Sequence, residues 1–295
     1  MKKTIDVSYT FDNTRWKTTL VSIISLLKNK GDSHYAIHCI VNADFFRNLD
    51  AQKQMTEIVA GIDAESSIEF VDFDEKNASI PYNKNMAFGG GICYYKMDSY
   101  RLLPNIDRVI HLDDDTIILK PLDELADIDL GDNYMAAFAV GNAFHLSARR
   151  SAYKDICEFN AGVVALNLKL IRESKVYESF AEILKNKDLS YEQGLMSVAF
   201  KGKLAMCNDG DTTYNFRIHC DRARGKEIGI IHYTGKKPWF FPTRMSGIWW
   251  KYAKMSPFYK TFLANAIYNF FLYIFVMPIP SKSLRHKLRS KFSRV

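Results

Sequence analysis

The sequence predicts an α/β protein in which a largely parallel β-sheet is covered by helices on both faces. Through the first 112 residues, short apolar runs alternate with segments of helical periodicity. This alternation is typical of parallel strands joined by helical crossovers. The chain of 295 residues is long enough for one large α/β domain, and its 47% hydrophobic and 25% charged content is that of an ordinary globular protein.

The predicted elements follow one another regularly. Strands are expected where β-branched and aromatic residues gather, and helices where apolar residues recur every three or four positions. The expected strands are 5–10, 35–41, 67–73 and 108–112, and the expected helices are 16–28, 51–62, 94–103 and 194–200. Pro104 ends the helix at 94–103. Gly89, Gly90 and Gly91 lack the spacing of a phosphate-binding loop, so a mobile loop is expected there.

Three consecutive aspartates are the most informative feature of the chain. Asp113, Asp114 and Asp115 follow the strand at 108–112 and precede a second apolar run at 116–119. Ligands of parallel sheets bind beyond the carboxyl ends of the strands, where this triplet falls. Adjacent acids repel one another unless a cation lies among them, and carboxylates two apart suit magnesium or manganese bound to a phosphate. The alternative is a solvated acidic turn.

Further polar motifs follow the triplet. They are Phe-Asn-Ala-Gly at 159–162, Glu192 with Gln193, and His-Tyr-Thr-Gly-Lys-Lys-Pro-Trp at 232–239. The Asn160 amide both donates and accepts, which suits sugar hydroxyls. The imidazole of His232 suits a metal ion, and the glycine and lysines after it suit a diphosphate. The structural alternatives are a turn at 159–162, helix capping at 192–193 and a packed core histidine.

The cysteines indicate a reducing compartment. Their number is odd, they are widely spaced and they form no C-x-x-C pair: Cys39, Cys93, Cys157, Cys207 and Cys220. Neither a disulfide framework nor a zinc site is therefore expected. The first residues include two lysines but no apolar segment typical of a secretory signal, which favours the cytoplasm.

The net charge of +7 is concentrated at the C-terminal end. Residues 228–295 contain 12 Lys or Arg and no acid, whereas residues 1–227 contain 28 basic and 33 acidic residues. An aromatic, apolar stretch at 262–279 precedes six basic residues, which predicts a segment lying in the headgroup region of an anionic membrane. The alternative is a core helix with a solvated tail. No nucleic-acid-binding module accompanies the basic tail, so nucleic acid is not an expected partner.

The motifs occur in an order that resembles retaining glycosyltransferase family 8. This family includes glycogenin and bacterial lipooligosaccharide galactosyl- and glucosyltransferases. The resemblance covers roughly residues 5–250 and rests on the acid triplet and the three motifs after it. It implies a Rossmann-like, nucleotide-sugar-binding glycosyltransferase fold of the A type. We expect a catalytic domain at 1–255 and a membrane-associating C-terminal extension at 256–295.

The resemblance also implies roles for individual residues. Asp113, Asp115 and His232 would hold Mn²⁺ or Mg²⁺. The remaining donor site would comprise Tyr9, Thr10, Phe11 and Asn13 at the uridine, Lys96, Asp113 and Asp114 near the donor, Gly235 and Lys237 at the diphosphate, and Asn160, Glu192 and Gln193 at the sugar and reacting centre. Two positions depart from the family pattern. Phe11 stands where several relatives have an acid that reaches uracil, and Val140 falls near a position where an acid often contacts the donor sugar.

The resulting functional hypothesis is a retaining hexosyltransferase. It would transfer galactose or glucose from UDP-galactose or UDP-glucose to a saccharide acceptor in bacterial lipopolysaccharide or another surface glycan. The acceptor is expected to be lipid-linked. The enzyme would be cytoplasmic and peripheral at the inner face of the cytoplasmic membrane. A front-face route and a double displacement both remain open. Two alternatives are a membrane-peripheral protein that binds metal and lipid, and a nucleotidyltransferase that releases pyrophosphate.

Overall fold

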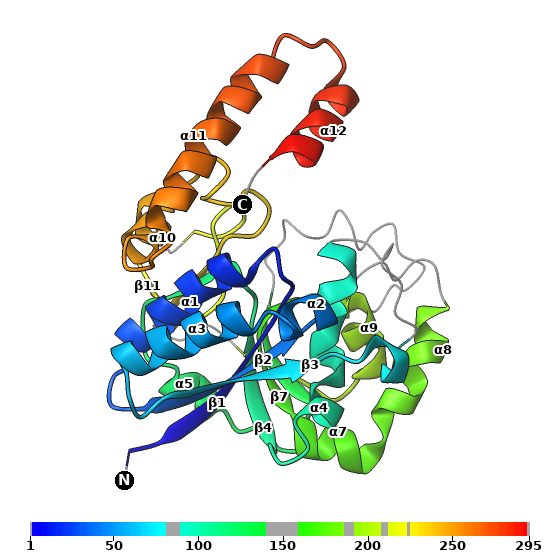
Figure 1. The fold of residues 1–295 in the computed structure, drawn as a ribbon. Coiled ribbons are helices and arrows are strands. Elements are labelled where there is room, and N and C mark those ends of the chain that lie inside the picture. Colours follow the sequence, from blue (N-terminus) through cyan, green and yellow to red (C-terminus); the bar gives the residue numbers. More distant parts are fainter. Residues whose placement is uncertain are drawn as a thin grey trace.

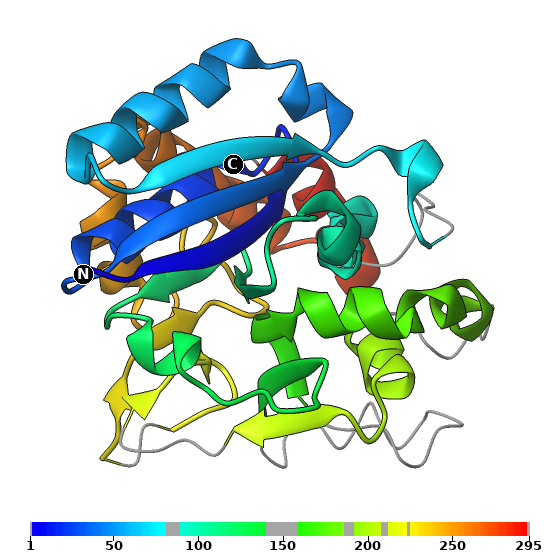
Figure 2. The same cartoon turned by 90° about the horizontal axis from the view of Figure 1, so that it is seen from below.

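The computed structural model describes residues 2–80, 89–139, 159–185, 192–207, 212–222 and 225–293. At its centre is a seven-stranded sheet with the strand order β3-β2-β1-β4-β7-β6-β8. In chain order the strands are β1 (Thr4–Phe11), β2 (His34–Val41), β3 (Ser67–Asp72), β4 (Arg108–Leu112), β6 (Met135–Ala139), β7 (Phe159–Asn167) and β8 (Leu204–Cys207). Figure 2 shows this order from β3, in cyan, to β8, in yellow-green.

The sheet is mostly parallel, as predicted. Strands β3, β2, β1 and β4 are parallel neighbours, and β6 is parallel to β8. Strand β7 is antiparallel to both β4 and β6. The described residues also form two smaller sheets. In the three-stranded one, β12 (Ile230–His232) lies between β5 (Thr116–Ile118) and β10 (Phe216–Arg217). In the two-stranded one, β9 (Thr212–Thr213) pairs with β11 (Glu227–Ile228).

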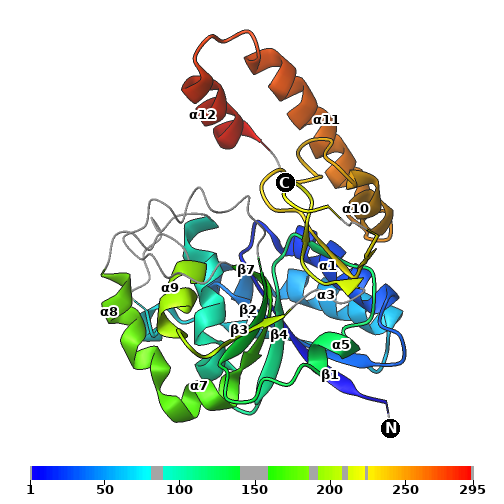
Figure 3. The same cartoon turned by 180° about the vertical axis from the view of Figure 1, so that it is seen from behind.

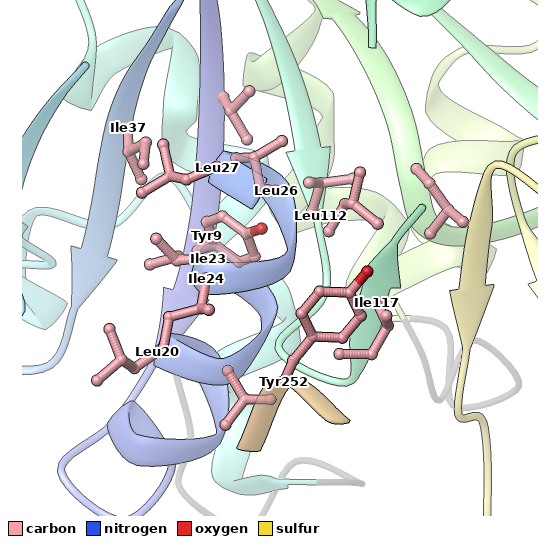
Figure 4. Close-up of a cluster of buried hydrophobic side chains, with 14 of the residues drawn as sticks. Tyr9, Leu20, Ile23, Ile24, Leu26, Leu27, Ile37, Leu112, Ile117 and Tyr252 are labelled. Carbon is pink, nitrogen blue, oxygen red and sulfur yellow. The ribbon is translucent and has the colours of Figure 1, made fainter. Parts of the chain in front are cut away.

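Helices cover both faces of the sheet (Figures 1 and 3). On one side lie α1 (Trp16–Lys28), α2 (Ala43–Phe46), α3 (Leu49–Ile62) and α10 (Ser246–Ala253); on the other lie α4 (Ser99–Leu102), α7 (Leu168–Ser174), α8 (Phe180–Leu184) and α9 (Glu192–Ala199). Strand β4 alternates between two hydrophobic clusters. Ile110 and Leu112 pack in the cluster with α1 (Figure 4), whereas Val109 packs in the cluster with α9. The alternation arises because successive side chains of a β-strand point to opposite faces of the sheet.

Most predicted elements are confirmed. The helix at 16–28 and the strand at 108–112 have the predicted bounds, and the other early elements differ by one or two residues at either end. The segment before Pro104 is different: Gly89–Asp98 forms the 3-10 helix η2, and only Ser99–Leu102 is α-helical. The side chains of 94–100 are buried on every side, so this segment lacks the single apolar face of a surface α-helix. The loop expected at the three glycines is instead the start of η2.

The C-terminal helices extend away from the sheet (Figures 1 and 3). Helix α11 (Tyr259–Val276) leads into α12 (Lys282–Phe292), and the two pack against each other. Only Phe262, Asn269 and Val276 of α11 are buried. Among the residues that the structure describes, no helix is both long and apolar enough to span a membrane.

A buried histidine joins three strands of the sheet. His38 on β2 contacts Asp6 on β1, with 2.8 Å between Nε2 and Oδ1, and Glu69 on β3, with 2.5 Å between Nδ1 and Oε1. Burial lowers the pKa of His38, but the hydrogen bonds to the two carboxylates outweigh this effect and raise the pKa above its ordinary value of 6.5. The imidazolium thus donates to both acids.

We predict that this contact makes folding stability depend on pH. Because the folded pKa is raised, the contribution is complete below pH 6.5 and is lost as the pH rises through the folded pKa. Its size should not exceed about 1 kcal/mol, since Glu69 is largely exposed. Denaturant unfolding at pH 6 and pH 9 should show a smaller loss of stability for His38→Gln than for the wild type. An equal loss in both proteins would contradict the prediction.

Candidate active site

The aspartate triplet forms a tight turn at the carboxyl end of β4. The main-chain nitrogen of Asp113 donates to the carbonyl of Gly162 on β7 at 2.8 Å. The carbonyl of Asp113 accepts from Thr116, at 3.2 Å from its main-chain nitrogen and 2.8 Å from its hydroxyl. The turn is therefore held at both ends, and it presents the carboxylates at the edge of the sheet where the sequence predicts a ligand site.

Strand β12 brings His232 to this turn. It runs antiparallel to β5 with His232 opposite Thr116, and the main-chain nitrogen of Tyr233 donates to the carbonyl of Asp115 at 3.0 Å. Nε2 of His232 lies 3.1 Å from Oδ1 of Asp115 and 3.7 Å from Oδ2 of Asp113. The three potential ligand atoms lie within 4.8 Å of one another. Two carboxylates and one imidazole fit Mn²⁺ or Mg²⁺ with remaining ligands from a phosphate.

Gly162 provides the space for this histidine. A Cβ atom at position 162 would lie 2.1 Å from Cε1 of His232 and 2.8 Å from Oδ2 of Asp113. Both distances are shorter than non-bonded atoms allow, so any side chain here would displace the imidazole or the carboxylate. The glycine of the Phe-Asn-Ala-Gly motif is therefore required by close approach to the proposed metal ligands.

We expect Gly162→Ala to weaken Mn²⁺ binding by at least about 10-fold, the lower end of the effect of disturbing the support of metal ligands. Calorimetric titration with Mn²⁺ measures this directly. Gly61→Ala is the matched control, because nothing lies within 4 Å of an added Cβ on that α3 residue. Wild-type Mn²⁺ affinity in a folded Gly162→Ala protein would disprove the close-approach argument.

Lys96 lies behind the turn and is fully buried. Its Nζ is 2.8 Å from Oδ1 of Asp113, 2.9 Å from the carbonyl of Ala161 and 3.6 Å from Oε1 of Glu192. Burial disfavours the ammonium, but the charges of Asp113 and Glu192 prevail and raise the pKa of Lys96 above its ordinary value. Lys96 is thus a permanent cation that joins η2 to the acid turn and to the first residue of α9.

Lys237 contacts the other end of the turn. Its Nζ pairs with Oδ2 of Asp115 and donates to the carbonyl of Tyr233 at 3.1 Å. Gly235, two residues earlier, has a φ of 77°, a conformation that favours glycine. Burial raises the pKa of the Asp115 carboxyl, but Lys237 and His232 outweigh burial and hold it well below its ordinary value.

The central aspartate has a partner that the sequence analysis missed. Nη1 of Arg15 donates to both oxygens of Asp114, at 3.2 and 3.1 Å, and the side chain of Asp114 is almost completely buried. Each acid of the triplet therefore has its own basic partner: Lys96, Arg15 and Lys237, respectively. Side-chain cations offset much of the mutual repulsion, so repulsion alone does not require a metal ion here.

Two buried polar residues beside the metal-binding groups were also not predicted. His111 on β4 lies between Ser8, with 3.1 Å from its Nδ1 to Oγ, and Asp113, with 3.3 Å from its Nε2 to Oδ1. Burial, reinforced by Lys96, lowers the pKa of His111 to about 4. Asn215 contacts His232 with 3.0 Å between Oδ1 and Nδ1. His111 interrupts the apolar run of β4, and Asn215 directly precedes β10. Neither residue belongs to a sequence pattern that indicates a functional site.

The residues expected at the sugar lie near the same turn. Asn160 is the second residue of β7, two residues before Gly162, and its Oδ1 accepts from the Gly162 nitrogen at 3.0 Å. Glu192, which is 9% exposed, faces Lys96, and Gln193 follows it in the first turn of α9. The structure thus brings Asn160 and Glu192 to the acid turn.

The residues expected at uridine divide into two groups. Tyr9 is buried with its hydroxyl 3.1 Å from that of Ser22, and Phe11 packs edge-to-face on Phe45 at 4.9 Å between ring centroids. These two side chains belong to the core, so any contact of Tyr9 and Phe11 with uridine would involve their main-chain atoms. Thr10 is also buried, on the opposite face of β1, whereas Asn13 is exposed. Val140 lies outside the described residues.

The fold and the site together define a class of enzyme. A mostly parallel sheet with an Asp-x-Asp turn at the end of a central strand is the arrangement of A-type glycosyltransferases, which matches the sequence-based expectation. The model of glycosyl transferase family 8 matches residues 6–242, and the chain belongs to this family.

Several curated proteins are similar to the chain in sequence. Glycosyltransferase GlyE of Streptococcus pneumoniae is 28% identical over 51% of this chain and 38% of its own length. Lipopolysaccharide 1,3-galactosyltransferase of Salmonella typhimurium is 24% identical over 74% of this chain and 68% of its own. Lipopolysaccharide 1,2-glucosyltransferase of Escherichia coli is 28% identical over 50% and 48%. The chain spans less than half the length of GlyE and of its pneumococcal relatives GlyB and GlyF.

Solved structures confirm the fold. The galactosyltransferase LgtC, crystallised with donor and acceptor sugar analogues, superposes with a TM-score of 0.71 at 21% identity, covering 86% of this chain and 96% of LgtC. The bifunctional glycosyltransferase WbbM superposes with a TM-score of 0.70 at 18% identity, covering 90% of this chain and 52% of WbbM. The protein therefore has the A-type glycosyltransferase fold.

Proposed function

We propose that the protein is a metal-dependent, retaining hexosyltransferase that moves galactose or glucose from a UDP-sugar to a saccharide acceptor of a bacterial surface glycan. The observation that carries this proposal is the cluster of Asp113, Asp115 and His232, with ligand atoms within 4.8 Å, in a chain of family 8. Two relatives named for lipopolysaccharide galactosyl and glucosyl transfer support this class of acceptor and donor.

The residues around the cluster suit the departure of a diphosphate. A divalent ion held by the cluster would supply Lewis-acid stabilisation of the leaving group. Lys237, beside Asp115, is placed to donate to the diphosphate as its charge develops. Lys96 is fully buried behind Asp113, and it would fix that carboxylate rather than move with the substrate.

Glu192 suits electrostatic stabilisation better than covalent catalysis. A covalent nucleophile must approach the anomeric carbon with a free carboxylate oxygen. One oxygen of Glu192 lies 3.6 Å from the buried ammonium of Lys96, and this pairing reduces its nucleophilicity. The arrangement favours a front-face route, in which Glu192 and Gln193 would stabilise positive charge on the sugar and the leaving phosphate would accept the acceptor's proton.

The proposal is tested by product analysis with the purified full-length protein. Given Mn²⁺ and a panel of UDP-hexoses, the protein should release UDP, and chelation of the metal should stop the release. UDP should also bind in calorimetry only when Mn²⁺ is present, because an ion held by Asp113, Asp115 and His232 would supply positive charge for the diphosphate. Release of hexose 1-phosphate in place of UDP would indicate transfer of UMP and support a nucleotidyltransferase instead. Equal UDP affinity with and without the ion would contradict the proposed metal role.

We further propose that residues 256–295 hold the enzyme at an anionic membrane surface, which is the inner face of the cytoplasmic membrane in a bacterium. Large apolar side chains are exposed along α11, including Phe271 at 63% and Phe275 at 80%. The basic α12 lies beside it. Each Lys or Arg near such a surface contributes about 1 kcal/mol, in addition to burial of the aromatic side chains. This position would bring the enzyme to lipid-linked acceptors.

Liposome sedimentation tests this placement with the full-length chain. The wild type should bind anionic vesicles at low salt and be partly released at high salt. Phe271→Ser combined with Phe275→Ser should reduce binding, because both side chains are exposed and would enter the headgroup layer. Leu49→Ser on α3 is the control, since Leu49 is 71% exposed but lies on another helix. Wild-type binding by the double variant would contradict the role of α11.

A further inference from the structure

Asn215 lies between the proposed metal site and the proposed sugar site. It is 6% exposed, directly precedes β10, and belongs to none of the sequence motifs. Its Oδ1 is 3.0 Å from Nδ1 of His232. Its Nδ2 donates to Asn160, at 3.3 Å to the main-chain carbonyl and 3.1 Å to Oδ1. One buried amide therefore contacts a proposed metal ligand on one side and a proposed sugar contact on the other.

These contacts determine which nitrogen of His232 carries the proton. The carbonyl of Asn160 can only accept a hydrogen bond, so the NH₂ group of Asn215 must face it. The oxygen of the Asn215 amide then faces the imidazole, and because an oxygen can only accept, Nδ1 of His232 must carry hydrogen. The lone pair of neutral His232 is thereby placed on Nε2, the nitrogen that lies 3.1 Å from Oδ1 of Asp115.

The same contacts determine what Asn160 can offer to a ligand. Its Oδ1 accepts from the main-chain nitrogen of Gly162 at 3.0 Å as well as from Asn215. The oxygen of this amide is thus engaged twice within the protein. Its NH₂ group remains to donate to an acceptor atom, such as a sugar hydroxyl oxygen.

We infer that Asn215 is a positioning residue that sets the metal-binding tautomer of His232 and holds the Asn160 amide for the donor sugar. Partners of this kind commonly orient metal-bound histidines through the nitrogen that does not bind the metal. Asn215 would link the metal and the sugar through one amide. The sugar half of this inference rests on the proposed function, whereas the metal half depends only on the His232 geometry.

Two substitutions in the full-length protein separate the two halves. Asn215→Ala removes both contacts and should weaken Mn²⁺ binding 10- to 100-fold in a titration without nucleotide. Asn215→Asp keeps an acceptor for Nδ1–H of His232 but cannot donate to Asn160. It should therefore bind Mn²⁺ within about 3-fold of the wild type, yet bind a UDP-hexose roughly 10-fold more weakly with little change for UDP, which is the scale of one lost hydrogen bond.

Asn29→Ala is the matched control, because Asn29 is another asparagine whose amide has three polar partners: Nδ2 of Asn29 lies within hydrogen-bond distance of Ser25, Ile118 and Tyr252. It should lower thermal stability without changing Mn²⁺ affinity. Circular dichroism verifies that each variant is folded. Wild-type Mn²⁺ affinity in Asn215→Ala, or an equal loss of affinity in Asn215→Ala and Asn215→Asp, would overturn the metal half. A wild type that transfers no hexose while Asn215→Ala still loses Mn²⁺ would reject the proposed function and leave the metal half standing.

Discussion

Asp115→Asn is expected to abolish hexose transfer while the protein remains folded. The substitution keeps the shape of the side chain but removes the charge that faces His232 and Lys237. The loss should reach about three orders of magnitude, the upper range for removing one preorganised electrostatic group. The main-chain contact from Tyr233 to residue 115 does not involve the side chain, so the joining of β12 to the turn should persist.

A UDP-release assay and a Mn²⁺ titration measure this effect, with circular dichroism to verify folding. Asp132→Asn serves as a control because Asp132 is an exposed acid in the turn that precedes β6. It should retain wild-type transfer. If Asp115→Asn kept most of its activity at low Mn²⁺ concentration, Asp115 would not be a metal ligand.

Lys96→Met is expected to destabilise the protein by about 3–5 kcal/mol, because it leaves Asp113 and Glu192 without their buried cation. Methionine has a similar length, so the change mainly removes charge rather than volume. Adding Glu192→Gln should restore part of the lost stability by removing one of the two unpaired carboxylates. Denaturant unfolding in the presence of a chelator measures both variants without a contribution from bound metal.

The control for this cycle is Lys53→Met, since Lys53 is 75% exposed and pairs only loosely with Glu57. Its free energy of unfolding should change by less than about 0.5 kcal/mol. Strict additivity of Lys96→Met and Glu192→Gln would show that the two charges do not interact. It would also remove the main argument that Glu192 is a paired, poorly nucleophilic carboxylate.

The sequence predicted the parts of the site that are continuous along the chain. The strand at 108–112 and the acid triplet were recognisable because an apolar run ends abruptly in charge. The partners of the triplet were harder to find, since Arg15 acts from the start of α1 and no local pattern relates it to Asp114. Asn215 and His111 escaped for a similar reason: a single polar residue becomes informative only when the neighbouring strands are placed.

The sequence pattern also failed to predict the type of helix before Pro104 and the direction of two side chains on β1. The residues before Pro104 suggested an α-helix, but Gly89–Asp98 forms a 3-10 helix instead, and the side chains of 94–100 are all buried. Likewise, the family resemblance placed Tyr9 and Phe11 at uridine without indicating which way their side chains point. The register of β1 beside β2 and β4 turns both rings into the α1 side of the core.

The pairing of β12 with β5 has a consequence for the order in which activity appears during synthesis. Ile230–His232 lies between β10 and β5 in a three-stranded sheet, and β5 precedes it by more than 100 positions. Domains form progressively as the chain leaves the ribosome. A nascent chain that ends before His232 can contain the whole of β1 to β8 and still lack the imidazole beside the aspartates. If His232 is a metal ligand, as proposed, we expect a nascent chain to become catalytically competent only after this short strand docks.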